Sequence, residues 1–128
     1  INPNPIVGPD RVKKKDNHSN KNFTYEGDEI RAFMGKQKNA FILNGDRHWQ
    51  YVSVDSETGA REYSCGAGSD THAGGFKQEL RTDEHRFLRI KGGFLSVSVD
   101  RDSGEPRIAL RHHDVHGEVM NEDLFWGD

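Results

Sequence analysis

The chain has 128 residues, of which 32% are hydrophobic and 30% are charged, and its net charge is −3. A weakly negative chain lacks the broad positive field that attracts nucleic acid or anionic lipid, so we expect neither partner. No apolar run approaches the roughly 20 residues needed to span a bilayer. Cys65 is the only cysteine, which excludes an intrachain disulfide and zinc sites built on paired cysteines.

The N-terminal part of the chain predicts a loop followed by a helix. Residues 1–22 contain three of the four prolines and no sustained periodicity, so we predict an extended loop there, either an ordered functional loop or a tail left by truncation. Asp28 is a candidate N-cap, and Ile30, Phe33 and Met34 have the spacing of one helix face. We therefore predict a short helix over about residues 28–38.

The remainder of the chain is dominated by strand patterns. The apolar run at residues 40–43 lacks polar alternation, which is typical of a strand buried on both faces in a layered α/β protein. Two hairpins are predicted from alternation and turn residues, at 49–65 and at 94–113. Between them lie a glycine-rich loop at 66–75 and a polar segment at 76–85 that has no clear signal. A C-terminal tail is expected to pack through Val119, Leu124, Phe125 and Trp126.

These elements predict a β-rich α/β fold, with residues 1–128 forming one segment. Because the first residue is Ile1 and not methionine, we expect a processed or truncated product. The low apolar content leads us to expect that part of the stabilising surface comes from residues outside this sequence.

The residues with the most chemical potential follow the buried strand directly, at positions 44–48. Strand ends at this edge of an α/β sheet project loop side chains into a common crevice, and Gly45 would let the backbone bend sharply there. Asp46 offers a hard oxygen and His48 a neutral nitrogen, which suits a metal such as iron, zinc or manganese. Arg47 has a planar fork that matches a phosphate. On these residues alone, a structural role in which Asp46 caps a turn stays open.

The surrounding sequence resembles one known family. Residues 41–50, FILNGDRHWQ, look like the Gly-Asp-x-His segment of the PhoD-like metallophosphatases, the alkaline phosphatase D family. Further similarity lies, in chain order, at residues 5–11, 15–20, 26–31, 61–66, 68–70, 91–95 and 111–117. The resemblance therefore covers nearly the whole chain and corresponds to the C-terminal part of that family's domain.

The resemblance implies metal-dependent hydrolysis of phosphate monoesters or diesters in a calcineurin-like layered αββα sandwich. Asp46 and His48 would be metal ligands and catalytic residues in a site with two divalent or trivalent ions, chosen among iron, calcium, zinc and manganese. The family's other ligands precede this segment and have no match here, so the site is expected to be incomplete without the remainder of the phosphatase domain. Because bacterial family members are commonly exported, we expect an extracellular or periplasmic location, although no signal peptide is visible.

Three residues are candidates for binding the phosphate ester, namely Arg47, Asn17 and His18. With Asp16 and Asn20, the latter two could line a substrate entrance, or they could serve as ordinary turn residues. Residues 11–15 form a basic run that reads as a solvated loop, but in a phosphatase its lysines could hold substrate phosphate near the site.

Two other polar clusters have structural or solvent-exposed roles as alternatives to a role in the site. Asp70 and His72 could support the site from the glycine-rich loop, with solvation the alternative. His112 and His113 are neighbours on a predicted strand and face opposite sides, so a structural role is favoured over a metal cluster.

Two non-catalytic functions remain open. The chain could be a β-rich module that completes a larger sheet. It could also be an inactive relative that binds phosphate without turning it over.

Overall fold

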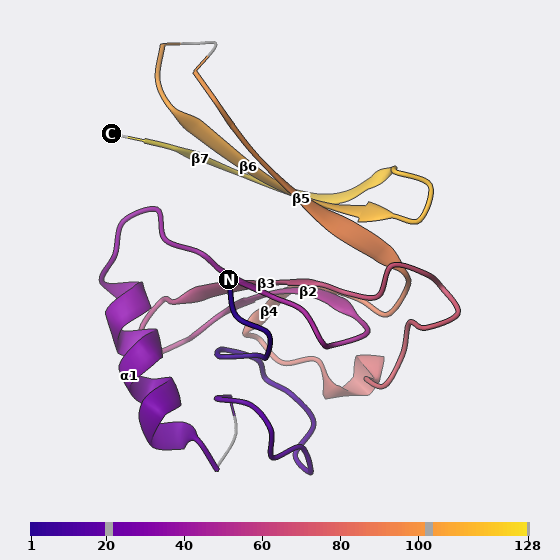
Figure 1. The fold of residues 1–128 in the computed structure, drawn as a ribbon. Helices are drawn as coiled ribbons and strands as arrows, with labels where there is room; N and C mark the ends of the chain where they lie inside the picture. The colour runs from indigo at the N-terminus through magenta and orange to yellow at the C-terminus, as the bar shows by residue number, and fades with distance from the viewer. Residues whose placement is uncertain (20–21, 102–103, 128) are drawn as a thin grey trace.

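The computed structural model describes residues 1–19, 22–101 and 104–127. In these residues the chain forms a small β-rich domain with two sheets and one α-helix (Figure 1). The elements, in chain order, are α1 (Thr24–Gly35), β1 (Ile42–Asn44), β2 (Gln50–Val54), β3 (Arg61–Cys65), the short 3₁₀ turn η1 (Gln78–Leu80), β4 (His85–Arg89), β5 (Gly93–Asp100), β6 (Arg107–Asp114) and β7 (Val119–Trp126).

The two sheets differ in topology. The first has the strand order β1-β3-β2-β4, in which β1 runs parallel to β3 and the other neighbours are antiparallel. The second is an antiparallel meander of β5, β6 and β7. An isolated parallel bridge joins Asn2 to Asn44 beyond β1, and α1 lies between these two residues in the chain. The helix therefore lies within a small crossover connection.

The sheets pack face to face around an apolar core. Side chains alternate along each strand, so one face of the four-stranded sheet presents Val52 and Tyr63 to Leu110 of the other sheet. Half-buried apolar side chains surround these three, namely Phe41, Leu43, Phe87, Leu95, Ile108 and Phe125. The buried imidazole of His112 joins this core, with its Nε2 2.9 Å from the carbonyl oxygen of Ser64. His113 faces the other way and stacks on Phe94, as strand alternation requires.

The helix and the N-terminal loop cover the opposite face of the four-stranded sheet (Figure 1). Ile30 and Met34 pack against a cluster formed by Ile6, Val7, Ile42 and Ala60. Close approach is possible because a Cβ atom at Gly27 would lie only 2.1 Å from the carbonyl oxygen of His18. The same holds at the other end, where a Cβ atom at Gly35 would lie 2.1 Å from the carbonyl oxygen of Thr58. These two glycines let the helix backbone lie directly on neighbouring loops.

The helix starts earlier than the sequence predicted. It begins at Thr24, and Phe23 occupies the N-cap position without a side-chain cap, so the prediction of Asp28 as N-cap was wrong. Asp28 lies inside the helix and pairs with Arg31. Phe33 was expected on the core face, but its side chain is 63% exposed. The earlier start is consistent with the contact at Gly27, which places the first helical turn against the N-terminal loop.

Both predicted hairpins are confirmed, as β2 with β3 and β5 with β6. Of the turn in the second hairpin, residues 102 and 103 lie outside the described residues, as does the last residue, 128. The predicted strand at residues 40–43 is shifted to Ile42–Asn44, and the expected tail is a regular strand, β7. Strand β4 was not predicted, because Arg86 and Arg89 interrupt its apolar residues. No helix in the described part of the chain is long and apolar enough to cross a membrane.

Candidate functional site

The turn after β1 presents Asp46. The amide of Arg47 donates to the carbonyl of Gly45 at 2.6 Å, which closes a three-residue turn with Asp46 at its centre. Asp46 has a φ of 59°, a left-handed conformation that aspartate tolerates better than most residues. The sharp bend therefore falls on Asp46 and not on Gly45, where the sequence analysis placed it. Strained backbone of this kind is common at functional sites.

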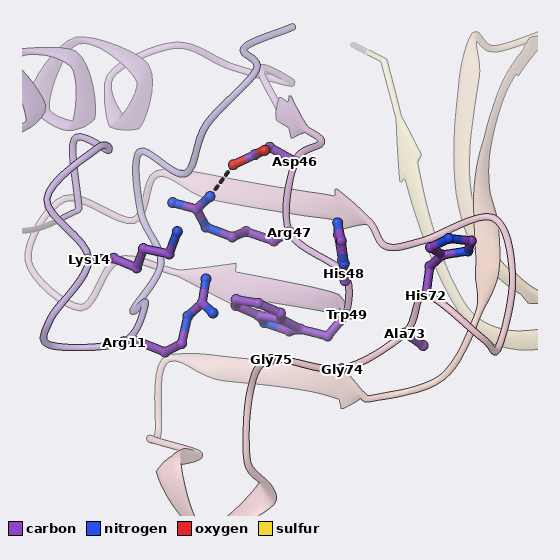
Figure 2. Close-up of a pocket in the computed structure, with 10 residues that line it drawn as sticks. All are labelled: Arg11, Lys14, Asp46, Arg47, His48, Trp49, His72, Ala73, Gly74 and Gly75. Carbon is purple, nitrogen blue, oxygen red and sulfur yellow. Dashed lines mark hydrogen bonds and ion pairs between the residues drawn. The ribbon is translucent and has the colours of Figure 1, made fainter.

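Asp46 and His48 face shared cavities. One cavity of about 370 Å³ is lined by both of them, and a second of about 460 Å³ adjoins it and is lined by the same pair. Figure 2 shows both side chains on the loop that follows β1, with Arg47 between them in the sequence. The Asp46 side chain is 53% exposed, and His48 is exposed. The residues that the sequence singled out as metal ligands are thus brought to one accessible place.

Arg47 is buried and surrounded by carboxylates. Its side chain is only 2% exposed, its Nε donates to Asp10 at 2.8 Å, and its Nη2 donates to Asp16 at 2.9 Å. Its Nη1 pairs with Oδ2 of Asp46 (Figure 2). Burial works against the charge of the guanidinium, but Asp10 and the other two carboxylates outweigh it and raise the pKa of Arg47. Each nitrogen of the guanidinium therefore holds a carboxylate of the protein.

Asn17 and His18 lie in the N-terminal loop that also carries Asp10 and Asp16. Among the described residues that line the two cavities, neither Asn17 nor His18 is present. The Asn17 side chain is buried, and its amide nitrogen donates to Asp10 at 3.0 Å. The His18 ring lies beside Glu26 and Phe23 at the start of the helix. Asn20, a further candidate for the substrate entrance, lies outside the described residues.

The glycine-rich loop at residues 66–75 forms the far wall of both cavities. The amide of Gly74 donates to the carbonyl of His48 at 2.9 Å, which ties this loop to the site. Asp70 accepts the amide of Gly92 at 2.8 Å, and His72 lies 2.8 Å from the hydroxyl of Ser69 through its Nδ1. His72 lines both cavities with Asp46 and His48. Asp70 thus anchors the loop, whereas His72 faces the site.

Cys65 takes no part in this wall. Its side chain is half-buried, and burial raises the pKa of the thiol, which keeps it protonated near neutral pH.

Arg11 and Lys14, to which the sequence assigned no individual role, also line the first cavity. Both reach in from the N-terminal loop, and the guanidinium carbon of Arg11 lies 5.0 Å from the ring centroid of Trp49 (Figure 2). The signal was present as the basic run at residues 11–15. What the sequence lacked was any indication of which of its five positions face the cavity.

The side chains at this site are of types that bind a metal ion, but they are few. Asp46 keeps its Oδ1 without a hydrogen-bond partner among the described residues, while Arg47 holds Oδ2, so the carboxylate is oriented with one oxygen available. Within residues 1–19, 22–101 and 104–127, no group of three or more His, Cys, Asp or Glu side chains is placed to hold a metal ion. The described chain thus offers the pair Asp46 and His48, with His72 nearby.

A comparison with models of known protein families and a search of curated proteins find no match to this chain.

Proposed function

We propose that this chain supplies one part of a metal-dependent phosphatase or phosphodiesterase site. The observation that carries the proposal is the placement of Asp46 and His48 in one cavity with Arg11 and Lys14. A hard oxygen and an imidazole nitrogen would hold the metal, and the two cations would face the phosphate ester. The sequence resemblance to PhoD-like phosphatases points to the same two residues.

The layering of the molecule supports the calcineurin-like part of the proposal. Two sheets pack face to face, and one of them is covered on its outer face by α1 and the N-terminal loop. This arrangement corresponds to three layers of an αββα sandwich. The site lies after β1, at the end of a strand whose side chains pack into the clusters on both faces of the sheet, and layered α/β proteins place their ligands at such strand ends.

Asp46 and His48 would hold the metal, with the orientation of Asp46 set by Arg47. When bound, such a metal would neutralise charge on the phosphoryl oxygens and lower the pKa of a coordinated water. Two side-chain donors are fewer than a catalytic site uses, so we infer that the remaining ligands come from the rest of a phosphatase domain. The substrate would be a phosphate monoester or diester.

The small number of donors also favours a second candidate function. A relative that has lost its other ligands would bind phosphate through Arg11 and Lys14 without hydrolysing an ester. This candidate shares the anion-facing residues and differs only in turnover, so activity separates the two.

The test is hydrolysis of a chromogenic phosphate monoester and a diester with added manganese, zinc, iron or calcium. The longest gene product that contains this chain is compared with its Asp46→Asn variant, and with Asp83→Asn as a control at an exposed position outside the cavities. Asparagine also tolerates a left-handed backbone, so the turn is kept. We expect Asp46→Asn to lower turnover about a hundredfold or more, since losing even an outer partner of a metal ligand costs 10- to 100-fold.

The control should retain full activity. Equal activity of the parent and Asp46→Asn would contradict the role of Asp46. No turnover by the parent with any metal would favour the phosphate-binding candidate.

A further inference from the structure

The cavity at Asp46 and His48 has a cationic side. Arg11 and Lys14 line it together with Trp49, Gly74 and Gly75. Their neighbours in the basic run, Lys13 and Lys15, are exposed and do not line this cavity. The run is therefore divided between two charges that face the site and two that face solvent.

Arg11 is held in place from two sides. Its Nε lies 3.3 Å from Oδ1 of Asp10, a carboxylate whose other oxygen holds Arg47. Its guanidinium also covers the ring of Trp49, which is itself stacked on Phe76 at a centroid distance of 4.8 Å. A guanidinium fixed in this way loses little side-chain entropy when it binds an anion.

The outer nitrogens of Arg11 remain available. Among the described residues, Nη1 and Nη2 of Arg11 have no hydrogen-bond partner. A Cβ atom added at Gly75 would lie 3.2 Å from Nη1, and Gly75 has a φ of +83°, so glycine keeps the wall open beside the guanidinium. Arg47 is the arginine that the sequence singled out for phosphate. Each of its three guanidinium nitrogens instead pairs with a carboxylate of the protein.

We propose that Arg11 and Lys14 form the anion subsite for the phosphoryl group, and that this subsite favours a doubly charged terminal phosphate over a phosphate diester. The inference rests on the proposed function and adds the class of substrate. A terminal phosphate carries close to two negative charges at neutral pH and offers three oxygens, whereas a diester carries one charge and two free oxygens. Two adjacent cations distinguish these groups through charge and through the number of charge-assisted hydrogen bonds.

The test measures binding without metal and without catalysis. Inorganic phosphate and dimethyl phosphate are titrated into the 128-residue chain at mildly alkaline pH and constant ionic strength, with chelator present, and NMR shift changes are followed. We expect phosphate to bind more tightly than dimethyl phosphate. Arg11→Gln should weaken phosphate binding about tenfold and remove most of this preference, since a hydrogen bond to a charged group contributes that much.

Lys13→Gln is the matched control, because it makes the same change in net charge at an exposed neighbour outside the cavity. It should leave phosphate binding within about twofold, as expected for a screened surface charge. Lys14→Gln provides a second variant that leaves the contact between Arg11 and Asp10 in place, and it should weaken phosphate binding in the same direction as Arg11→Gln.

Equal losses in Lys13→Gln and Arg11→Gln would overturn the subsite, and so would equal affinity for the two probes. If Arg11→Gln does not fold, unchanged binding in Lys14→Gln overturns it. Phosphate binding that depends on Arg11, in a chain whose full-length product hydrolyses no ester, would support the subsite and overturn the proposed catalysis.

Discussion

At the scale of single residues, Arg47 connects the parts of the site. It pairs with Asp10 and Asp16 of the N-terminal loop and with Asp46 of the turn after β1. A buried guanidinium is tolerated because several carboxylates compensate for the loss of water. Because each of its three nitrogens already pairs with a carboxylate and its side chain is buried, Arg47 is less accessible to substrate than Arg11. Its position is explained by holding the loop and orienting Asp46.

His112 makes the stability of the protein sensitive to acid. Burial lowers the pKa of this imidazole to about 4, from an ordinary value of 6.5, although the Ser64 carbonyl opposes the shift. The neutral form is therefore favoured in the folded state, and below pH 6.5 the unfolded chain takes up a proton that the folded chain resists. We therefore expect the contribution of His112 to the free energy of unfolding to be constant above pH 6.5. Between pH 6.5 and about pH 4, the free energy of unfolding should fall progressively by about 3 kcal/mol.

Urea unfolding followed across this pH range measures the effect. His112→Phe keeps an aromatic ring between Tyr63 and Phe87 and should flatten the loss, whereas His116→Gln, at an exposed position, should leave the pH dependence as it is. An unchanged slope in His112→Phe would assign the acid sensitivity to other groups.

At the scale of elements, Glu62 of β3 fixes the N-terminal loop. Its carboxylate is fully buried and accepts the amides of Ile6, Val7 and Gly8 at 2.6, 2.9 and 3.2 Å. It also accepts the hydroxyl of Tyr51 at 2.6 Å. Burial raises the pKa of Glu62 in spite of these four donors. Glu62 thus ties the start of the loop that carries Arg11 and Lys14 to β3.

Glu62→Gln should loosen this loop. The amide group would face donors that need an acceptor, which leaves about two of them unpaired at a cost of about 2 kcal/mol or more. Hydrogen exchange at the amides of Ile6, Val7 and Gly8 should accelerate in the variant. Glu79→Gln, on the exposed turn η1, serves as the control and should exchange like the parent. Unaltered protection in Glu62→Gln would show that other contacts hold the loop.

Local patterns in the sequence predicted elements well where neighbours alone decide them. The two hairpins follow from alternation and turn residues, and both are present. The predicted start of the helix was wrong because the first helical turn packs through Gly27 against the carbonyl of His18. This contact is distant from any capping signal in the local sequence. Strand β4 was missed because its register against β2 comes from tertiary pairing, while Arg86 and Arg89 interrupt its own pattern.

At the scale of the whole molecule, the site depends on contacts that are distant in sequence. Asp46 and His48 could be singled out because they follow a buried strand. The roles of Arg47 and Arg11 could not be read in the same way, since Arg47 meets Asp10 and Asp16 across 37 and 31 residues. The sequence therefore singled out the two residues that we propose as metal ligands, whereas the different contacts of the two arginines emerged only from the fold.

Metal binding at Asp46 and His48 tests the proposed site most directly. Manganese or zinc is titrated into the longest gene product that contains this chain, and the affinities of its Asp46→Asn and His48→Gln variants are compared with that of His116→Gln, which changes an exposed histidine outside the cavities. We predict that each of the first two variants loses about tenfold or more in affinity and that His116→Gln binds like the parent. Metal binding that is equal in all three variants and the parent would contradict the account.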